Sequence, residues 1–106
     1  MPLAPYQAAV QSYWDVDAPA NSLVWFPDPD EESLPDGYHI YRRAANETES
    51  VLLATVGLTY AYTDATAAPG VVYEYTIAGF RGRVETSPVS LAIRTADAQD
   101  HPETIS

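Results

Sequence analysis

Residues 59–80 read TYAYTDATAAPGVVYEYTIAGF and contain two alternating apolar runs joined by a turn-rich stretch. Tyr60 and Tyr62 stand two residues apart, as residues on one face of a strand do. Residues 63–70 are small or polar and end in Pro-Gly, which predicts that the chain crosses over there. The following run has a period of two, so we expect one face of a long strand to enter a core. The residues of that face are Val71, Tyr73, Tyr75 and Ile77.

A buried tyrosine needs a hydrogen-bond partner for its hydroxyl group. Tyr73 follows the Pro-Gly crossover by three residues. A tyrosine in that place can bond back to the backbone of the crossing, an arrangement known as a tyrosine corner. The sequence therefore predicts that Tyr73 fixes the crossover.

The rest of the chain reads as short strands separated by turns rich in Gly, Pro and polar residues. We expect strands at 6–13, 21–26, 37–43, 50–56, 59–62, 70–80 and 84–95, the first as either a strand or an arm and the last broken near Pro88. Residues 14–20 are predicted to be an acidic turn. Seven strands at this spacing indicate an all-β, seven-stranded antiparallel β-sandwich. Its predicted core is Leu23, Trp25, Tyr38, Ile40, Tyr73, Tyr75 and Ile77.

Four segments in order resemble the fibronectin type III domain family over residues 22–95. They are Leu23-Val24-Trp25 before a proline-rich loop, GYHIYR at 37–42, the crossover of YTD at 62–64 with PGVVYEYTI at 69–77, and Ser87-Pro88 before the last strand. The resemblance implies a fibronectin type III-like sandwich at 21–95, an arm or first strand at 1–20 and a polar tail at 96–106. It also implies a spacer, adhesion or assembly role without catalysis. The departure lies at 1–20, which is longer than the usual first strand, and Trp14 has no counterpart in the family.

The charge balance is strongly acidic, with fifteen Asp and Glu against five Arg, no Lys and a net charge of −10. Nucleic acid and anionic membranes are poor partners for such a chain, because phosphate contacts need clustered Lys and Arg. No apolar run is long enough to span a bilayer. The simplest interpretation of the acidic composition is a well-hydrated surface. Lysine-free acidic sequences also resemble proteins of halophilic archaea and their viruses, with high-GC bacteria or their phages as the alternative source.

Arg81 and Arg83 flank Gly82 in the expected turn between the last two strands. This pair is the densest positive spot of the chain and could dock a carboxylate of a neighbouring subunit. The alternative is an ordinary polar hairpin turn. The other candidate partner contacts are Trp14, His101 and Ile105; Trp14 with Tyr13 could instead cover one end of the sandwich.

The remaining polar groups point to no chemistry. Five carboxylates crowd residues 28–36, but the spacing of a calcium loop is missing and a solvated loop is the expectation. His39 and His101 have no second ligand at a plausible spacing and the chain has no Cys, so no metal or cofactor is expected. No nucleophile stands with a base, so an enzyme is not expected. Asn46-Glu47-Thr48 matches a glycosylation sequon, a triplet common by chance.

The leading hypothesis is a structural or decoration subunit of a viral particle, and the virus expected is a tailed virus of a prokaryote. Its partners would be other virion subunits or copies of itself, with weak contact to a host surface. The N-terminus lacks the features of a signal peptide, so we expect synthesis in the host cytoplasm and release in the virion. The alternatives are a binding or spacer module of a larger secreted or cell-surface protein, such as an adhesin or polysaccharide-active enzyme, and a cytoplasmic regulatory partner.

Overall fold

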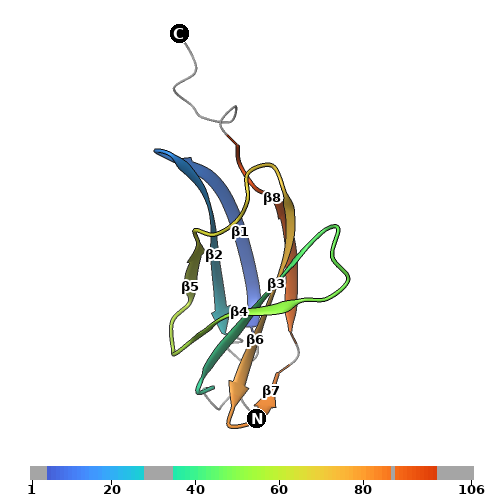
Figure 1. The fold of residues 1–106 in the computed structure, drawn as a ribbon. Coiled ribbons are helices and arrows are strands. Elements are labelled where there is room, and N and C mark those ends of the chain that lie inside the picture. The colour runs from blue at the N-terminus through green and yellow to red at the C-terminus, as the bar shows by residue number, and fades with distance from the viewer. Residues whose placement is uncertain (1–4, 28–34, 87, 98–106) are drawn as a thin grey trace.

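The strands follow the period-two apolar segments and are separated by turns. The computed structural model describes residues 5–27, 35–86 and 88–97 (Figure 1). Over those ranges the strands are β1 (Pro5–Asp15), β2 (Ala18–Pro27), β3 (Gly37–Ala44), β4 (Val51–Val56), β5 (Ala61–Asp64), β6 (Val72–Arg81), β7 (Val84–Glu85) and β8 (Val89–Arg94).

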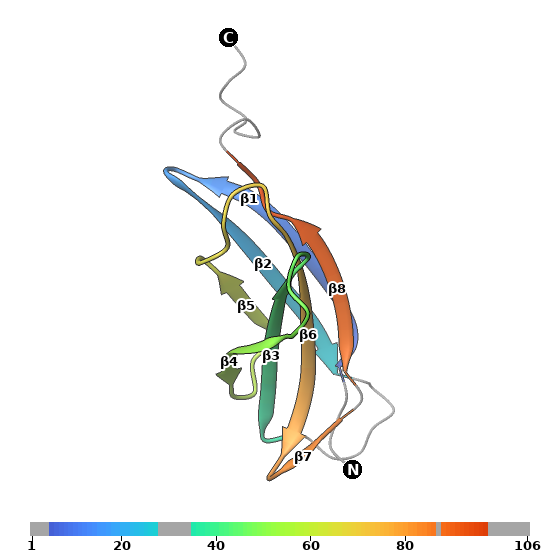
Figure 2. The ribbon, with the colours of Figure 1, turned by 45° about the vertical axis from the view of Figure 1, so that its right-hand side comes forward.

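The strands form two antiparallel sheets that pack face to face, as Figure 2 shows from a second side. One sheet has the order β1-β2-β5. The other has the order β4-β3-β6-β7, with β8 also paired to β6. The predicted all-β antiparallel sandwich is therefore confirmed. The predicted last strand is divided into β7 and β8, because pairing with β6 stops at Glu85 and resumes at Val89.

The core lies between the inner faces of the two sheets. The predicted core residues all belong to its buried cluster: Leu23, Trp25, Tyr38, Ile40, Tyr73, Tyr75 and Ile77. Trp25 and Tyr38 meet edge to face, with ring centroids 5.4 Å apart. Alternation places these side chains inside, because successive residues of a strand point to opposite faces.

A turn lies within the predicted range 14–20, but it is shorter than predicted. β1 continues to Asp15 and β2 begins at Ala18, so a hairpin joins them through Val16 and Asp17 alone. Two-residue hairpin turns are normally marked by Asn-Gly or a similar pair. Here Val16 adopts the left-handed region at φ 57°. The apparent turn signal from Pro19 lies inside β2, opposite Trp14.

The strand predicted at 59–62 is displaced by two residues. β5 begins at Ala61, and Tyr60 precedes it, with its carbonyl oxygen accepting a 3.0 Å hydrogen bond from the Trp25 amide. Tyr60 and Tyr62 therefore do not share the face of one strand. The chain bends before β5, where the Thr59 amide donates to the Gly57 carbonyl at 2.8 Å.

Candidate functional site

The turn between β6 and β7 carries the two predicted arginines. Gly82 lies between Arg81 and Arg83 and has φ 58°, a conformation that glycine adopts without strain. Its amide donates a 2.8 Å hydrogen bond to Oδ2 of Asp36, just before β3. The Asp36 amide in turn donates to the Phe80 carbonyl at 2.8 Å. These bonds hold the turn against the start of β3 while both arginine side chains remain exposed.

A cluster of side chains beside this turn lies on the outer face of β3, β6 and β7. The His39 ring stacks on Phe80, with centroids 4.1 Å apart and planes at 8°. Oε2 of Glu85 lies 2.6 Å from His39 Nδ1 and accepts a 2.5 Å hydrogen bond from the Tyr41 hydroxyl. The cluster ties the short strand β7 to β3 across β6, so the base of the arginine turn is fixed on both sides.

The hydrogen bonds of this cluster shift two acid–base equilibria. Donation from Tyr41 and His39 lowers the pKa of the Glu85 carboxyl. The hydrogen bond to that carboxylate, together with partial burial, raises the pKa of Tyr41 to about 12. Glu85 is therefore a carboxylate at neutral pH and balances part of the positive charge of the adjacent turn.

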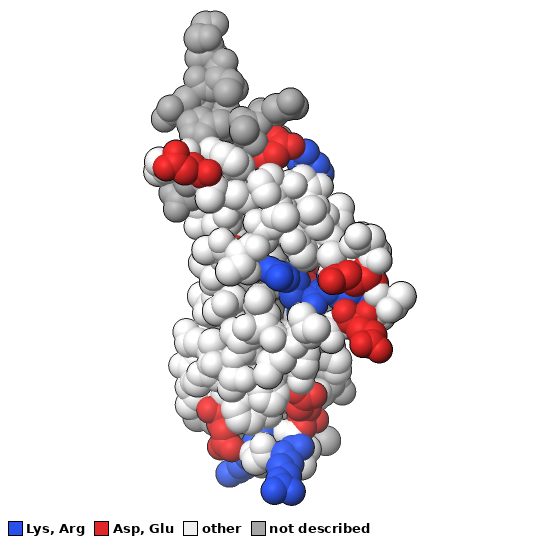
Figure 3. Space-filling view, in the orientation of Figure 1, with Lys and Arg blue, Asp and Glu red and all other residues white. Residues whose placement is uncertain are grey.

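The arginines of this acidic chain fall into two groups. Arg42, Arg43 and Arg94 lie 2.9, 3.6 and 2.8 Å from Asp64, Glu74 and Asp97. Arg81 and Arg83 have no ion pair with any residue in the described ranges. Figure 3 shows positive atoms at the lower tip of the molecule, the end at which β6 turns into β7 in Figure 1. Unpaired guanidinium groups on a fixed turn suit a bidentate contact with an anion of a partner.

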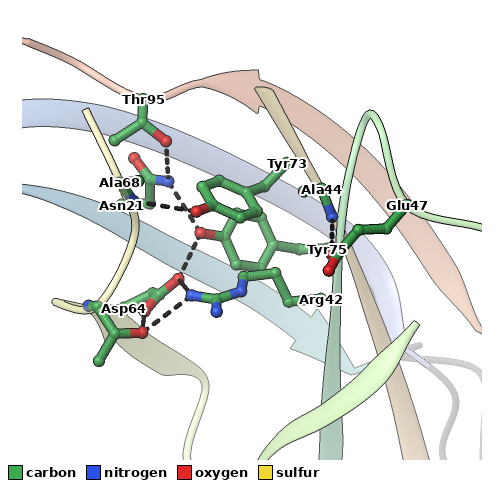
Figure 4. Close-up of polar contacts among 10 residues, drawn as sticks. Asn21, Arg42, Ala44, Glu47, Asp64, Ala68, Tyr73, Tyr75 and Thr95 are labelled. Atoms are coloured by element: carbon green, nitrogen blue, oxygen red, sulfur yellow. Dashed lines mark hydrogen bonds and ion pairs between the residues drawn. The ribbon is translucent and has the colours of Figure 1, made fainter. Parts of the chain in front are cut away.

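A polar network holds the crossover between β5 and β6 from the inside, as Figure 4 shows. Asp64 is fully buried, and its Oδ2 accepts hydrogen bonds from Arg42 at 2.9 Å and from the Tyr75 hydroxyl at 2.6 Å. Its Oδ1 accepts from the amide and the hydroxyl of Thr66 at 2.9 and 2.7 Å. Asn21 Nδ2 extends the network by donating to the Tyr75 oxygen at 2.8 Å. We call these residues the Asp64 network.

Tyr73 forms the predicted tyrosine corner. Its hydroxyl oxygen accepts a 3.0 Å hydrogen bond from the backbone amide of Ala68, within the crossover. The Arg42 guanidinium lies over the Tyr73 ring, 4.7 Å from its centroid. The corner therefore joins the Asp64 network, which the sequence did not reveal.

Burial and hydrogen bonding oppose each other at Asp64. Burial works to raise the pKa of its carboxyl, but the hydrogen bonds from Thr66, Tyr75 and Arg42 outweigh it and hold the pKa below the ordinary value of 3.8. Burial, reinforced by the bond to Asp64, also raises the pKa of Tyr75. Asp64 is thus ionised and fully occupied by its partners, which makes it a structural carboxylate.

Of the other predicted contact residues, Trp14 is described by the structure and does not join the arginine turn. Trp14 lies at the end of β1, where its Nε1 donates to the Val16 carbonyl at 3.1 Å. Figures 1 and 2 place that hairpin at the opposite end of the sandwich from β7. His101 and Ile105 lie outside the described residues, as do Asp28, Asp30, Glu31 and Glu32 of the acidic loop.

The described ranges lack both a cluster of metal ligands and a membrane-spanning helix. No group of three His, Cys, Asp or Glu side chains there is arranged to hold a metal ion. In the same ranges, no helix is long and apolar enough to cross a bilayer.

Similarity to solved structures identifies the fold. A segment of chicken tenascin with two fibronectin type III domains superposes with a TM-score of 0.70 and 22% identity, covering 86% of this chain and 49% of that one. A Fn3-like protein from Clostridium thermocellum gives 0.63 and 21%, covering 89% and 96%. The twitchin kinase region from C. elegans gives 0.64 and 22%, covering 76% and 14%. The fold is therefore that of a fibronectin type III domain, as the sequence resemblance implied.

Comparison by sequence gives no match to a family model. It also gives no match to a curated protein. The similarity thus establishes the architecture of the chain, and its function must be argued from its surface.

Proposed function

We propose that this chain is a non-catalytic protein-binding or spacer module, and that the Arg81–Gly82–Arg83 turn is its contact element. The observation that carries the proposal is the position of these two arginines. In a chain of net charge −10 they stand together, exposed, on a turn fixed by the bond from Gly82 to Asp36. The matching partner group is a carboxylate-rich protein surface, because a guanidinium fork bonds a carboxylate bidentately.

Within this class we propose a structural subunit of a prokaryotic virus particle, with copies of the chain or other virion subunits as partners. The support is compositional. Fifteen acidic residues without a single lysine resemble proteins adapted to high salt, where a carboxylate-rich surface stays hydrated. In such an assembly most surfaces are negative, and an exposed arginine pair supplies the complementary sign.

A second candidate is a module within a larger secreted or cell-surface protein. The tenascin segment, of which this chain spans 49%, carries two fibronectin type III domains in one polypeptide. The length of the open reading frame that encodes this chain distinguishes the candidates, because a module of this kind lies within a longer frame.

The contact element is tested by neutralising it in the native assembly. In Arg81→Gln/Arg83→Gln the net charge becomes more negative by two. We expect the fraction of the chain that co-sediments with its assembly to fall at least about tenfold, since one lost charge-assisted pair weakens binding by roughly 1.4 kcal/mol or more. The matched control is Thr48→Glu/Ser50→Glu, which changes net charge equally at exposed positions between β3 and β4.

The control should co-sediment like the wild type. Equal co-sedimentation of the arginine variant would refute the contact element. Co-sedimentation with particles that contain a viral genome supports the virion proposal, whereas recovery with the cell envelope contradicts it and supports the second candidate.

A further inference from the structure

The sheet β1-β2-β5 has an outer face that differs from the rest of this acidic molecule. Its three strands contain only two charged residues, Asp15 and Asp64, and Asp64 is fully buried. The outward side chains described on this face are Gln7, Ala9, Gln11, Tyr13, Ser22, Val24, Phe26, Ala61 and Thr63. We call this set the neutral face. Figure 3 shows the flank over β2 and β5 almost without charged atoms.

The neutral face combines a hollow with exposed apolar side chains. An open groove of about 260 Å³ runs between β1 and β2, lined by Ala9, Val10, Gln11, Ser22 and Val24. Next to it on β2, Phe26 is 55% exposed. Tyr13 and Val24 are exposed on the same face. A hollow beside a protruding ring can accept a ring of the same kind from another molecule.

The strand register makes the face complementary to itself. Ala9 lies opposite Val24, and Gln11 lies opposite Ser22. Consider a two-fold axis that lies between two such faces, perpendicular to β2 and level with Val24. Phe26 and Ser22 stand two residues from Val24 on opposite sides, so this axis places Phe26 of the second copy over Ser22 of the first. Ser22 lines the groove, so each ring enters the groove of the other copy. Such an isologous contact closes as a dimer.

Charge restricts the approach of a second copy to the neutral face. Two copies carry a combined charge of twice −10, so their approach through most surfaces brings carboxylates together. Approach through the neutral face desolvates no described charged side chain. Aligned packing of two sheets is a regular arrangement, with the inner faces about 10 Å apart.

The size of the face sets the strength of the contact. β1 and β2 have 11 and 10 residues, whereas β5 has 4. At roughly 3.4 Å per residue and about 4.8 Å between strands, the three strands span on the order of 400 Å². A standard stable interface buries about 800 Å² on each side. The contact therefore suits a weak, reversible dimer.

We propose that the neutral face is a self-association surface through which two copies of this chain form a two-fold dimer, with Phe26 of each copy in the groove of the other. This surface is separate from the arginine turn. A dimer would carry two such turns and could bridge two partners.

The first test varies the salt concentration, because salt should strengthen this contact and should weaken an ion pair. Sedimentation equilibrium of the purified chain is measured from 0.05 to 2 M NaCl. Screening of the mutual repulsion should tighten the dimer at least about tenfold over this range. A contact made by Arg81 and Arg83 should instead weaken, so failure of the dimer and failure of the proposed function are distinguishable.

Substitution of Phe26 provides the second test. Phe26→Thr retains a residue suited to a strand and should weaken the dimer at least about tenfold at 2 M NaCl. Leu52→Thr is the matched control, because Leu52 is 54% exposed on β4 of the other sheet. It should dimerise like the wild type. Thermal unfolding of both variants verifies that the fold is retained.

The two-fold geometry is tested by cross-linking. The chain has no cysteine, so each single substitution introduces the sole thiol. Val24→Cys lies at the axis, where the two sheets are about 10 Å apart, so a short bis-maleimide linker should join two copies into a covalent dimer, whereas Leu52→Cys should not be joined. A chain that stays monomeric at millimolar concentration in 2 M NaCl overturns the proposal. Cross-linking of Leu52→Cys without Val24→Cys also overturns it, as does a neutral face covered only by a different protein.

Discussion

The two sheets of the sandwich differ in where their charged side chains lie. The outer face of the sheet β1-β2-β5 is neutral. Asp64 of β5 is fully buried and faces the other sheet. On the sheet of β4, β3, β6, β7 and β8, polar pairs lie on the outer face, such as the hydrogen-bonded pair of His39 with Glu85 and the ion pair of Arg43 with Glu74. The Asp64 network joins the two sheets in the interior, whereas the outer pairs are exposed to water and salt.

This difference separates stability from recognition. A buried carboxylate with four hydrogen bonds is strongly coupled to folding, because water cannot reach the carboxylate to replace a partner that it loses. Exposed pairs contribute little, since water and salt screen them. Substitutions in the buried network should therefore change the stability of the fold much more than substitutions at the exposed pairs.

The largest effect is expected from Asp64→Asn. The substitution keeps the shape but leaves the Arg42 guanidinium, whose side chain is 21% exposed, without its carboxylate. We expect the free energy of unfolding to fall by about 3 kcal/mol, measured by urea denaturation. The matched control Glu74→Gln removes an exposed carboxylate 3.6 Å from Arg43 and should change it by less than about 0.5 kcal/mol. Equal effects would abolish the distinction between the sheets.

A smaller effect is expected from Tyr73→Phe. It removes the oxygen that accepts the hydrogen bond from the Ala68 amide, so the crossover loses the tyrosine corner. We expect a loss of about 1–2 kcal/mol, because an unpaired amide has a desolvation penalty of that order. Tyr41→Phe, which removes an exposed hydroxyl from Glu85, is the comparison and should cost less. A loss near zero for Tyr73→Phe would mean that the corner does not hold the crossover.

Acidic pH should destabilise the fold through the Asp64 network. The pKa of Asp64 is lowered in the folded state, so its stabilising effect is complete above the ordinary value of 3.8 and is lost as pH falls through the folded pKa. The free energy of unfolding should therefore decrease below about pH 4 in the wild type. Asp64→Asn should show a shallower decrease over this window, measured by urea denaturation at a series of pH values. Parallel pH profiles would contradict an ionised Asp64.

Alkaline pH should destabilise the fold, because the buried Tyr38 becomes ionised. Burial, together with the charge of Tyr60, raises the pKa of Tyr38 to about 12. A raised pKa stabilises the fold below the ordinary value of 10, and this stabilisation is lost as pH rises from 10 to about 12. We expect thermal midpoints to fall over that range, and tyrosine absorbance should show a late group that ionises together with unfolding. If every tyrosine ionised near pH 10 without unfolding, the ionisation of Tyr38 would not be coupled to unfolding.

Alternation along the strands was sufficient to predict the core and the corner. Tyr38 and Ile40 were assigned to one face, and Tyr73 to the crossover, because a period of two and a Pro-Gly pair are local signals. The Asp64 network was missed because its members are distant in sequence. One signal was present: Arg42 continues the inward period of Tyr38 and Ile40, and an inward arginine requires a carboxylate.

The length of the turn at Val16 was predicted wrongly for a different reason. A β-branched residue in the left-handed region is rare, so no rule based on turn composition selects Val16-Asp17 over the Pro and Asn that follow. Pairing of ten residues of β1 with β2 decides the turn instead. The groove of the neutral face could not be predicted from the sequence either, since it depends on which residues of β1 and β2 lie opposite each other.

The smallest effect is expected from Glu85→Gln on the outer face of β7. The substitution keeps a hydrogen-bond acceptor for Tyr41 and His39 but removes the charge. Because Glu85 is 39% exposed, the free energy of unfolding should fall by at most about 1 kcal/mol, and less in 1 M NaCl. Its effect should appear instead in the order of the arginine turn, measured as faster amide hydrogen exchange at Gly82 than in the wild type. A loss as large as that of Asp64→Asn would show that the outer cluster, and not the interior alone, holds the sandwich together.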